Sequence, residues 1–120
     1  MGADQVAAMQ PAVVEIYSAP TSEDWCATFE VPGTEHWVQV VRNMLNANCP
    51  YDDDPQEPFA PAMSLLPDAE LTSWEAGTFA TFSHGDCAPY DIARAVDAVF
   101  VVPLGGDAAD YQVDVSMEQL

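Results

Sequence analysis

The stretch ELTSWEAGTFATFSHGDCAPYDIARAVDAVF, residues 70–100, decides the fold. Its first half holds two β-favouring runs, ELTSWE and TFATFSH, on either side of Ala76 and Gly77, a pattern that predicts a β-hairpin. Pro89 then suits the first turn of a helix that runs to about Val99. Apolar residues recur in this helix at helical spacing: Ile92, Ala95, Val96 and Val99. The following VFVVP is compatible with a continuing helix or with a short strand.

Strand patterns are found near both ends of the chain. AVVEIYS (12–18) is rich in β-branched residues, and WCATFEV (25–31) alternates between apolar and polar positions. The polar segment PTSED (20–24) separates them, so the sequence predicts an N-terminal hairpin. YQVDVSM (111–117) is predicted to close the chain as another alternating strand. Its inward side chains would be Val113, Val115 and Met117.

The strongest helical spacing lies between residues 35 and 47, after Thr34 as a suitable N-cap. A predicted helix over this range has the apolar face Trp37, Val38, Val41, Met44 and Leu45. Its opposite face is almost free of acids: His36, Gln39, Arg42, Asn43 and Asn46. A polar face nearly free of acids on such an acidic protein is compatible with homodimerisation.

Residues 48–69 hold five prolines and the run Asp52, Asp53, Asp54, so they predict a long loop with at most one helical turn at 62–66. Together the patterns predict a single α+β domain over residues 1–120, with an antiparallel sheet and two helices on one face. The expected order is the ferredoxin-like βαββαβ arrangement with an extra N-terminal strand.

Charge is the most informative feature of the composition. The chain has 20 Asp and Glu residues against two arginines and no lysine, a formal net charge of −18. Binding to nucleic-acid phosphates or to anionic membranes requires basic residues, so both are excluded as direct partners. No apolar run has the length of a membrane-spanning helix, and the first residues lack the pattern of a signal peptide, so the expected location is the cytoplasm.

The sequence holds no specific catalytic, cofactor or metal motif. Cys87 lies near His84, but a nucleophile and its base must meet in space, and adjacency in sequence does not show that. The three cysteines lack the spacing of a zinc site and are expected to be reduced. The run 52–54 lacks the glycine and terminal glutamate of an EF-hand loop. We therefore expect a protein that is not an enzyme and needs no cofactor.

A net charge of −18 exceeds the magnitude of roughly 2–8 that solubility requires in a small domain. Two uses explain the excess: capture of a protein rich in lysine and arginine, or adaptation to a salt-rich cytoplasm. For the first use, the expected contacts are acids in and beside the long loop, with two aromatic anchors. These residues are Asp52, Asp53, Asp54, Glu57, Asp68, Glu70 and Glu75, with Tyr51 and Phe59.

In its size, its acidity and its lack of catalytic motifs, the chain resembles the small acidic inhibitors of phages and mobile elements, which include anti-CRISPR and antirestriction proteins that mimic DNA. It is also similar in size and class to immunity proteins that neutralise toxins. The first resemblance implies a non-enzymatic inhibitor of a basic nucleic-acid-binding protein. The alternatives are an immunity protein and a salt-adapted domain from a halophile.

Overall fold

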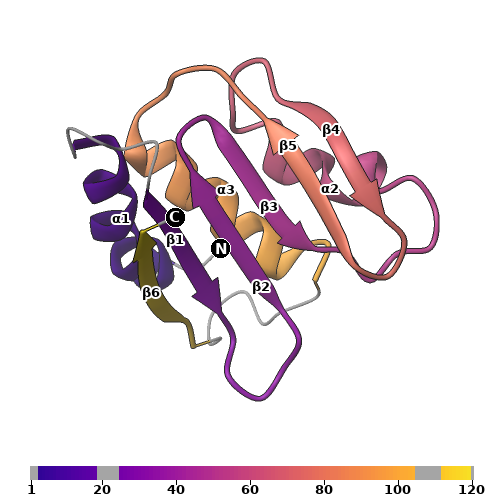
Figure 1. Ribbon diagram of the computed structural model, residues 1–120, viewed down its shortest axis with the longest axis horizontal. Coiled ribbons are helices and arrows are strands. Elements are labelled where there is room, and N and C mark those ends of the chain that lie inside the picture. Colours follow the sequence, from indigo (N-terminus) through magenta and orange to yellow (C-terminus); the bar gives the residue numbers. More distant parts are fainter. Residues whose placement is uncertain (1–2, 19–24, 105–111, 120) are drawn as a thin grey trace.

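The computed structural model describes residues 3–18, 25–104 and 112–119. They form an α+β fold with a six-stranded antiparallel sheet, and Figure 1 shows the three helices together on one face of it. The α+β class and the antiparallel sheet are therefore confirmed, whereas the predicted number of two helices is wrong. The predicted turn at 20–24 lies outside the described residues.

The strands are arranged in the order β4-β5-β3-β2-β1-β6, and every neighbouring pair is antiparallel. In chain order the elements are α1 (Ala3–Ser18), β1 (Trp25–Glu30), β2 (Trp37–Val41), β3 (Met44–Asn48), α2 (Gln56–Met63), β4 (Glu70–Glu75), β5 (Phe79–Ser83), α3 (Pro89–Val101) and β6 (Asp114–Gln119). No helix in the described ranges has both the length and the apolar character needed to cross a membrane.

The hairpin and helix predicted over residues 70–100 are confirmed as β4, β5 and α3. The hairpin turn contains Gly77 at φ +69°, a backbone conformation that glycine adopts without steric cost. Pro89 stands at the start of α3, and the helix continues through Phe100 to Val101, so VFVVP does not form a strand. The apolar face of α3 is fully buried, as the helical spacing predicted.

The predicted helix over 35–47 is wrong, because this segment forms the hairpin of β2 and β3. Val38 and Val40 alternate with half-buried Gln39, which is the period of a strand. Asn43 makes the tight turn at φ +61°, a region that asparagine tolerates better than most residues. Helical and strand spacing coincide over short windows, and here pairing with neighbouring strands decides the conformation.

The predicted strand over 12–18 is also wrong, because these residues complete the helix α1. Val6, Met9, Val13 and Ile16 are buried, and their spacing of three or four residues is helical. Pro11 lies within α1 on its exposed side. Proline usually ends a helix, and the β-branched run 12–18 starts directly after Pro11, so the strand prediction took no account of the residues before it.

The predicted loop over 48–69 contains a helix, α2, that starts earlier than the expected turn at 62–66. Phe59 and Ala62 bury one side of α2 against the sheet and α3. The ferredoxin-like arrangement is not confirmed, because the hairpin of β2 and β3 replaces its predicted first helix and the sheet has six strands in the order β4-β5-β3-β2-β1-β6.

The core lies between the sheet and the helices. Every second residue of a strand faces the core. Examples are Phe29, Val38, Val40 and Leu45, none of which has exposed surface. Of the inward residues predicted for the last strand, Val113 and Met117 pack against the core, whereas Val115 is 41% exposed. The reason is that β6 is an outer strand and only partly covered by α1.

Candidate functional site

The three aspartates at 52–54 lie on an exposed loop that leads from β3 into α2. Tyr51 fixes the start of this loop, since its hydroxyl donates a hydrogen bond of 2.7 Å to the carbonyl oxygen of Pro103. The amide of Gly77, in the turn after Glu75, donates a bond of 3.1 Å to the carbonyl oxygen of Tyr51. The acidic loop and the β4–β5 turn therefore lie side by side.

The loop ends at α2, whose N-cap position is Pro55, and Asp54 directly before it bonds to the first residue of the helix. The carboxylate of Asp54 accepts hydrogen bonds from the backbone amide of Gln56 at 2.9 Å and from its side-chain amide at 3.1 Å. Glu57 lies in the first turn of α2, where the helix dipole stabilises a negative charge. The acids at 52, 53 and 57 remain exposed, so this end of the fold presents a compact group of carboxylates.

Neither predicted aromatic anchor is an exposed side chain. Phe59 is fully buried, with its ring centroid 5.4 Å from that of Phe82. Tyr51 is half-buried, and its hydroxyl is occupied by the bond to Pro103. The proposed role of Phe59 at an interface is corrected: it holds α2 to the sheet and thereby positions the acidic loop.

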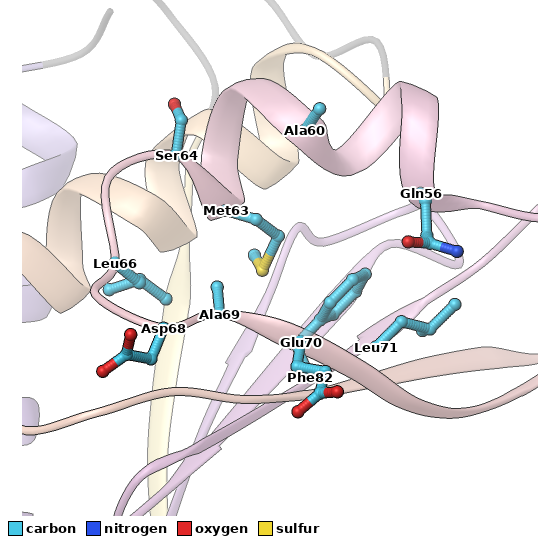
Figure 2. A pocket seen from close by; sticks show the side chains of 10 residues that line it. All are labelled: Gln56, Ala60, Met63, Ser64, Leu66, Asp68, Ala69, Glu70, Leu71 and Phe82. Atoms are coloured by element: carbon cyan, nitrogen blue, oxygen red, sulfur yellow. The ribbon is translucent and has the colours of Figure 1, made fainter.

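Glu70 lies at the opposite end of β4 from Glu75, about 17 Å away by the rise of a strand, and Asp68 stands two residues before it in the chain. They border a cleft of about 710 Å³ between α2 and the strands β4 and β5. Figure 2 shows Met63, Leu71 and Phe82 in the cleft, while the carboxylates of Asp68 and Glu70 point away from α2. The structure thus separates the predicted acids into two groups, 52–57 with Glu75, and 68 with 70.

The arginines do little to neutralise these acids. Within the described residues a single ion pair is seen, Arg94 to Asp91 at 4.0 Å, and exposed pairs of this kind contribute little. Both guanidinium groups lie over tyrosine rings, Arg42 over Tyr17 at 5.6 Å and Arg94 over Tyr90 at 5.8 Å. The exposed acids named above therefore keep their negative field.

The thiol of Cys87 does not have the environment of a nucleophile. Burial raises its pKa above the ordinary value, and the neighbouring carboxylates of Asp91 and Asp86 raise it further. A reactive cysteine needs a lowered pKa and positive neighbours. Nδ1 of His84 lies 2.8 Å from the carbonyl oxygen of Gly85, so this ring nitrogen is engaged by the backbone.

No group of three or more His, Cys, Asp or Glu side chains within the described ranges is arranged to hold a metal ion. Cys26 and Cys49 are buried free thiols. Burial is also the main cause that raises the pKa of Cys26, with a smaller contribution from Glu118 on the adjacent strand. The site is thus made of carboxylates, amides and hydroxyls, which are groups suited to recognition.

Comparison with protein-family models, with curated proteins and with solved structures found no match to this chain.

Proposed function

We propose that this protein is a non-enzymatic inhibitor that acts in the cytoplasm by occupying the nucleic-acid-contacting surface of a basic protein. The observation that carries the proposal is the set of exposed carboxylates at 52–54, 57 and 75, in a chain with 20 acids and no lysine. Self-repulsion on this scale destabilises a small fold, so a compensating interaction is expected. A surface rich in lysine and arginine supplies it.

Long-range attraction would bring the two proteins together, and the acidic loop would then take positions normally filled by phosphates. Electrostatic steering of this kind raises association rates and weakens as salt is added. The loop suits the task because the hydrogen bonds of Tyr51 to Pro103 and of Gln56 to Asp54 hold its two ends in place before binding. A loop that is already ordered loses less conformational freedom on binding.

The first test is an affinity capture from extract of the host, with mass spectrometry of the captured proteins. The proposal expects a basic nucleic-acid-binding protein whose activity is blocked by the purified chain. Capture of a secreted toxin would identify an immunity protein, and recovery of only neutral or acidic proteins would exclude both interpretations.

Replacing Asp52, Asp53 and Asp54 together with asparagine should slow association with the captured partner by about tenfold at low salt. The side-chain oxygen of an asparagine at position 54 can still accept the hydrogen bond from the backbone amide of Gln56, so the start of α2 is retained. Binding rates measured by surface plasmon resonance across a salt series should then show a shallower salt dependence than those of the wild type.

The matched control neutralises three acids elsewhere, Asp4→Asn, Glu15→Gln and Glu35→Gln, all of them exposed. It removes the same net charge and should slow association by less than about threefold. Equal slowing by both variants would show that only total charge matters, and the loop would then no longer be a contact.

The complete absence of lysine also favours a second candidate, a salt-adapted domain. Thermal melts between 0.05 and 1 M NaCl separate the two, since screening shortens the Debye length to about 3 Å at 1 M. The inhibitor should be folded throughout and gain several degrees in its melting temperature. A chain that is unfolded below about 1 M salt would instead support adaptation to high salt.

A further inference from the structure

The face of the sheet opposite the helices, which we call the open face, has an uncharged centre. Three of the four inner strands, β2, β3 and β5, carry no charged residue. Figure 1 views this face directly, and all three helices lie behind it. The side chains that these strands direct to it are half-buried or exposed: Trp37, Gln39, Val41, Met44, Asn46, Asn48, Phe79, Thr81 and Ser83.

A row of uncharged polar side chains crosses the open face. The strand registers place one such residue on each strand, in the order Ser116, Thr28, Gln39, Asn46, Thr81 and Ser73. Asn46 is the centre of the row, since its amide donates to Gln39 at 3.4 Å and its carbonyl oxygen accepts from Thr81 at 2.9 Å. The row is therefore ordered in advance and offers both donors and acceptors.

Acids border the open face on its two opposite margins. Glu30, Asp114 and Glu118 are on β1 and β6, and Glu70 and Glu75 are on β4. The two margins are about 19–24 Å apart by the spacing of strands. This width exceeds the roughly 10–12 Å diameter of a single helix, so the face fits a broad surface of a partner.

A hollow of about 270 Å³ lies beside the polar row. Val41 and Met44 supply apolar wall, and Glu118 is the single charged lining residue. The lining residues are Cys26, Gln39, Val41, Met44, Asn46, Thr81 and Glu118. An arginine fits this chemistry, because its aliphatic stem can pack on Val41 and Met44 while its guanidinium donates to the carboxylate and to amide oxygens.

We propose that the open face is a second contact surface for the basic partner, in addition to the acidic loop, and that an arginine of that partner enters the hollow at Glu118. This inference rests on the proposed function and adds a surface at which the partner is held. The acids at both margins would meet further lysines or arginines around an uncharged centre. Arginine anchors in desolvated hollows are frequent sources of binding energy.

A second copy of this chain is a poorer occupant. The open face has a footprint of about 400 Å², roughly half of the ~800 Å² per partner in a stable interface. The contact must therefore extend over the margins. Two copies would bring acids against acids there, whereas a basic partner brings opposite charge.

The test uses N-acetyl-arginine amide as the probe and follows the side-chain amide signals of Gln39 and Asn46 by NMR. We expect saturable shifts of both signals with a dissociation constant in the millimolar range. The uncharged isostere N-acetyl-citrulline amide should produce none. Shifts that are absent from the open face, or spread evenly over all acidic regions, would overturn the inference.

Two matched variants on β6 complete the test. Glu118→Gln should weaken binding of the probe at least fivefold, and binding of the captured partner about tenfold. Asp114→Asn removes the same charge from the same strand outside the hollow. It should change the affinity for the probe less than twofold and should weaken binding of the captured partner less than Glu118→Gln does. If the captured partner binds Glu118→Gln and wild type equally, the open face is excluded while the inhibitory function stands; if no basic partner is captured, that function fails.

Discussion

Replacing Val40 with aspartate should unfold the chain, whereas the same replacement at Val41 should leave it folded. Val40 has no exposed surface and faces the core from β2, while Val41 is half-buried on the open face. A carboxylate without a partner in the core costs more than about 4 kcal/mol, which is most of the stability of a typical small domain. At Val41 the carboxylate remains hydrated, and the expected cost is about 1 kcal/mol.

Urea denaturation followed by circular dichroism measures both effects. Val40→Ala provides a folded companion, with an expected loss of about 2–3 kcal/mol from the free energy of unfolding. If residues 35–47 formed the helix that their spacing predicted, Val41 would be on its apolar face and Val40 outside it. Aspartate at Val41 would then cost more stability than aspartate at Val40. Greater damage at Val41 than at Val40 would therefore contradict the hairpin.

Phe59→Ala should lower the free energy of unfolding by about 3–5 kcal/mol. The ring is fully buried between α2 and the sheet and packs on Phe82, so its removal leaves a cavity. The corresponding fall in melting temperature is roughly 10–20 °C. Calorimetry of the purified variant measures it, and the acidic loop should lose order before the rest of the fold because α2 anchors its end.

Trp74→Ala is the control for this prediction. The indole is larger but 37% exposed on the outer strand β4, so its removal should cost less than about 2 kcal/mol. If Phe59 were an exposed anchor, as its place among prolines suggested, its replacement would leave stability unchanged and reduce only binding. Equal losses for the two variants would contradict the packing described for α2.

Local signals were sufficient for the β4–β5 hairpin and for α3. Gly77 and Pro89 fixed the limits of the β4–β5 hairpin and of α3, and both were predicted. Residues 35–47 failed because their apolar positions satisfy both periods, and only pairing with β1 and β5 selects the strands. The N-terminal helix was missed because Pro11 concealed a helical spacing that extends from Val6 to Ile16.

The candidate site was predictable as a set of exposed acids but not as a surface. Composition and the loop pattern indicated residues 52–54 and 57, which are exposed, and could not show that Phe59 is buried. The polar row through Asn46 depends on strand register, which joins residues far apart in the chain. The sequence signal for this surface was the acid-poor set of polar residues at 35–47. Its members Gln39 and Asn46 belong to strands of the sheet and not to a helix.

The outer strands β4 and β6 leave backbone donors and acceptors available for pairing with another chain. Each carries two acids, Glu70 and Glu75 on one and Asp114 and Glu118 on the other, and β4 is further interrupted by a register shift between Leu71 and Ser73. If the outer strands of two copies paired, their acids would lie close together, and repulsion between these like charges opposes such edge-to-edge pairing. The same carboxylates thus also protect the protein from assembling into fibrils.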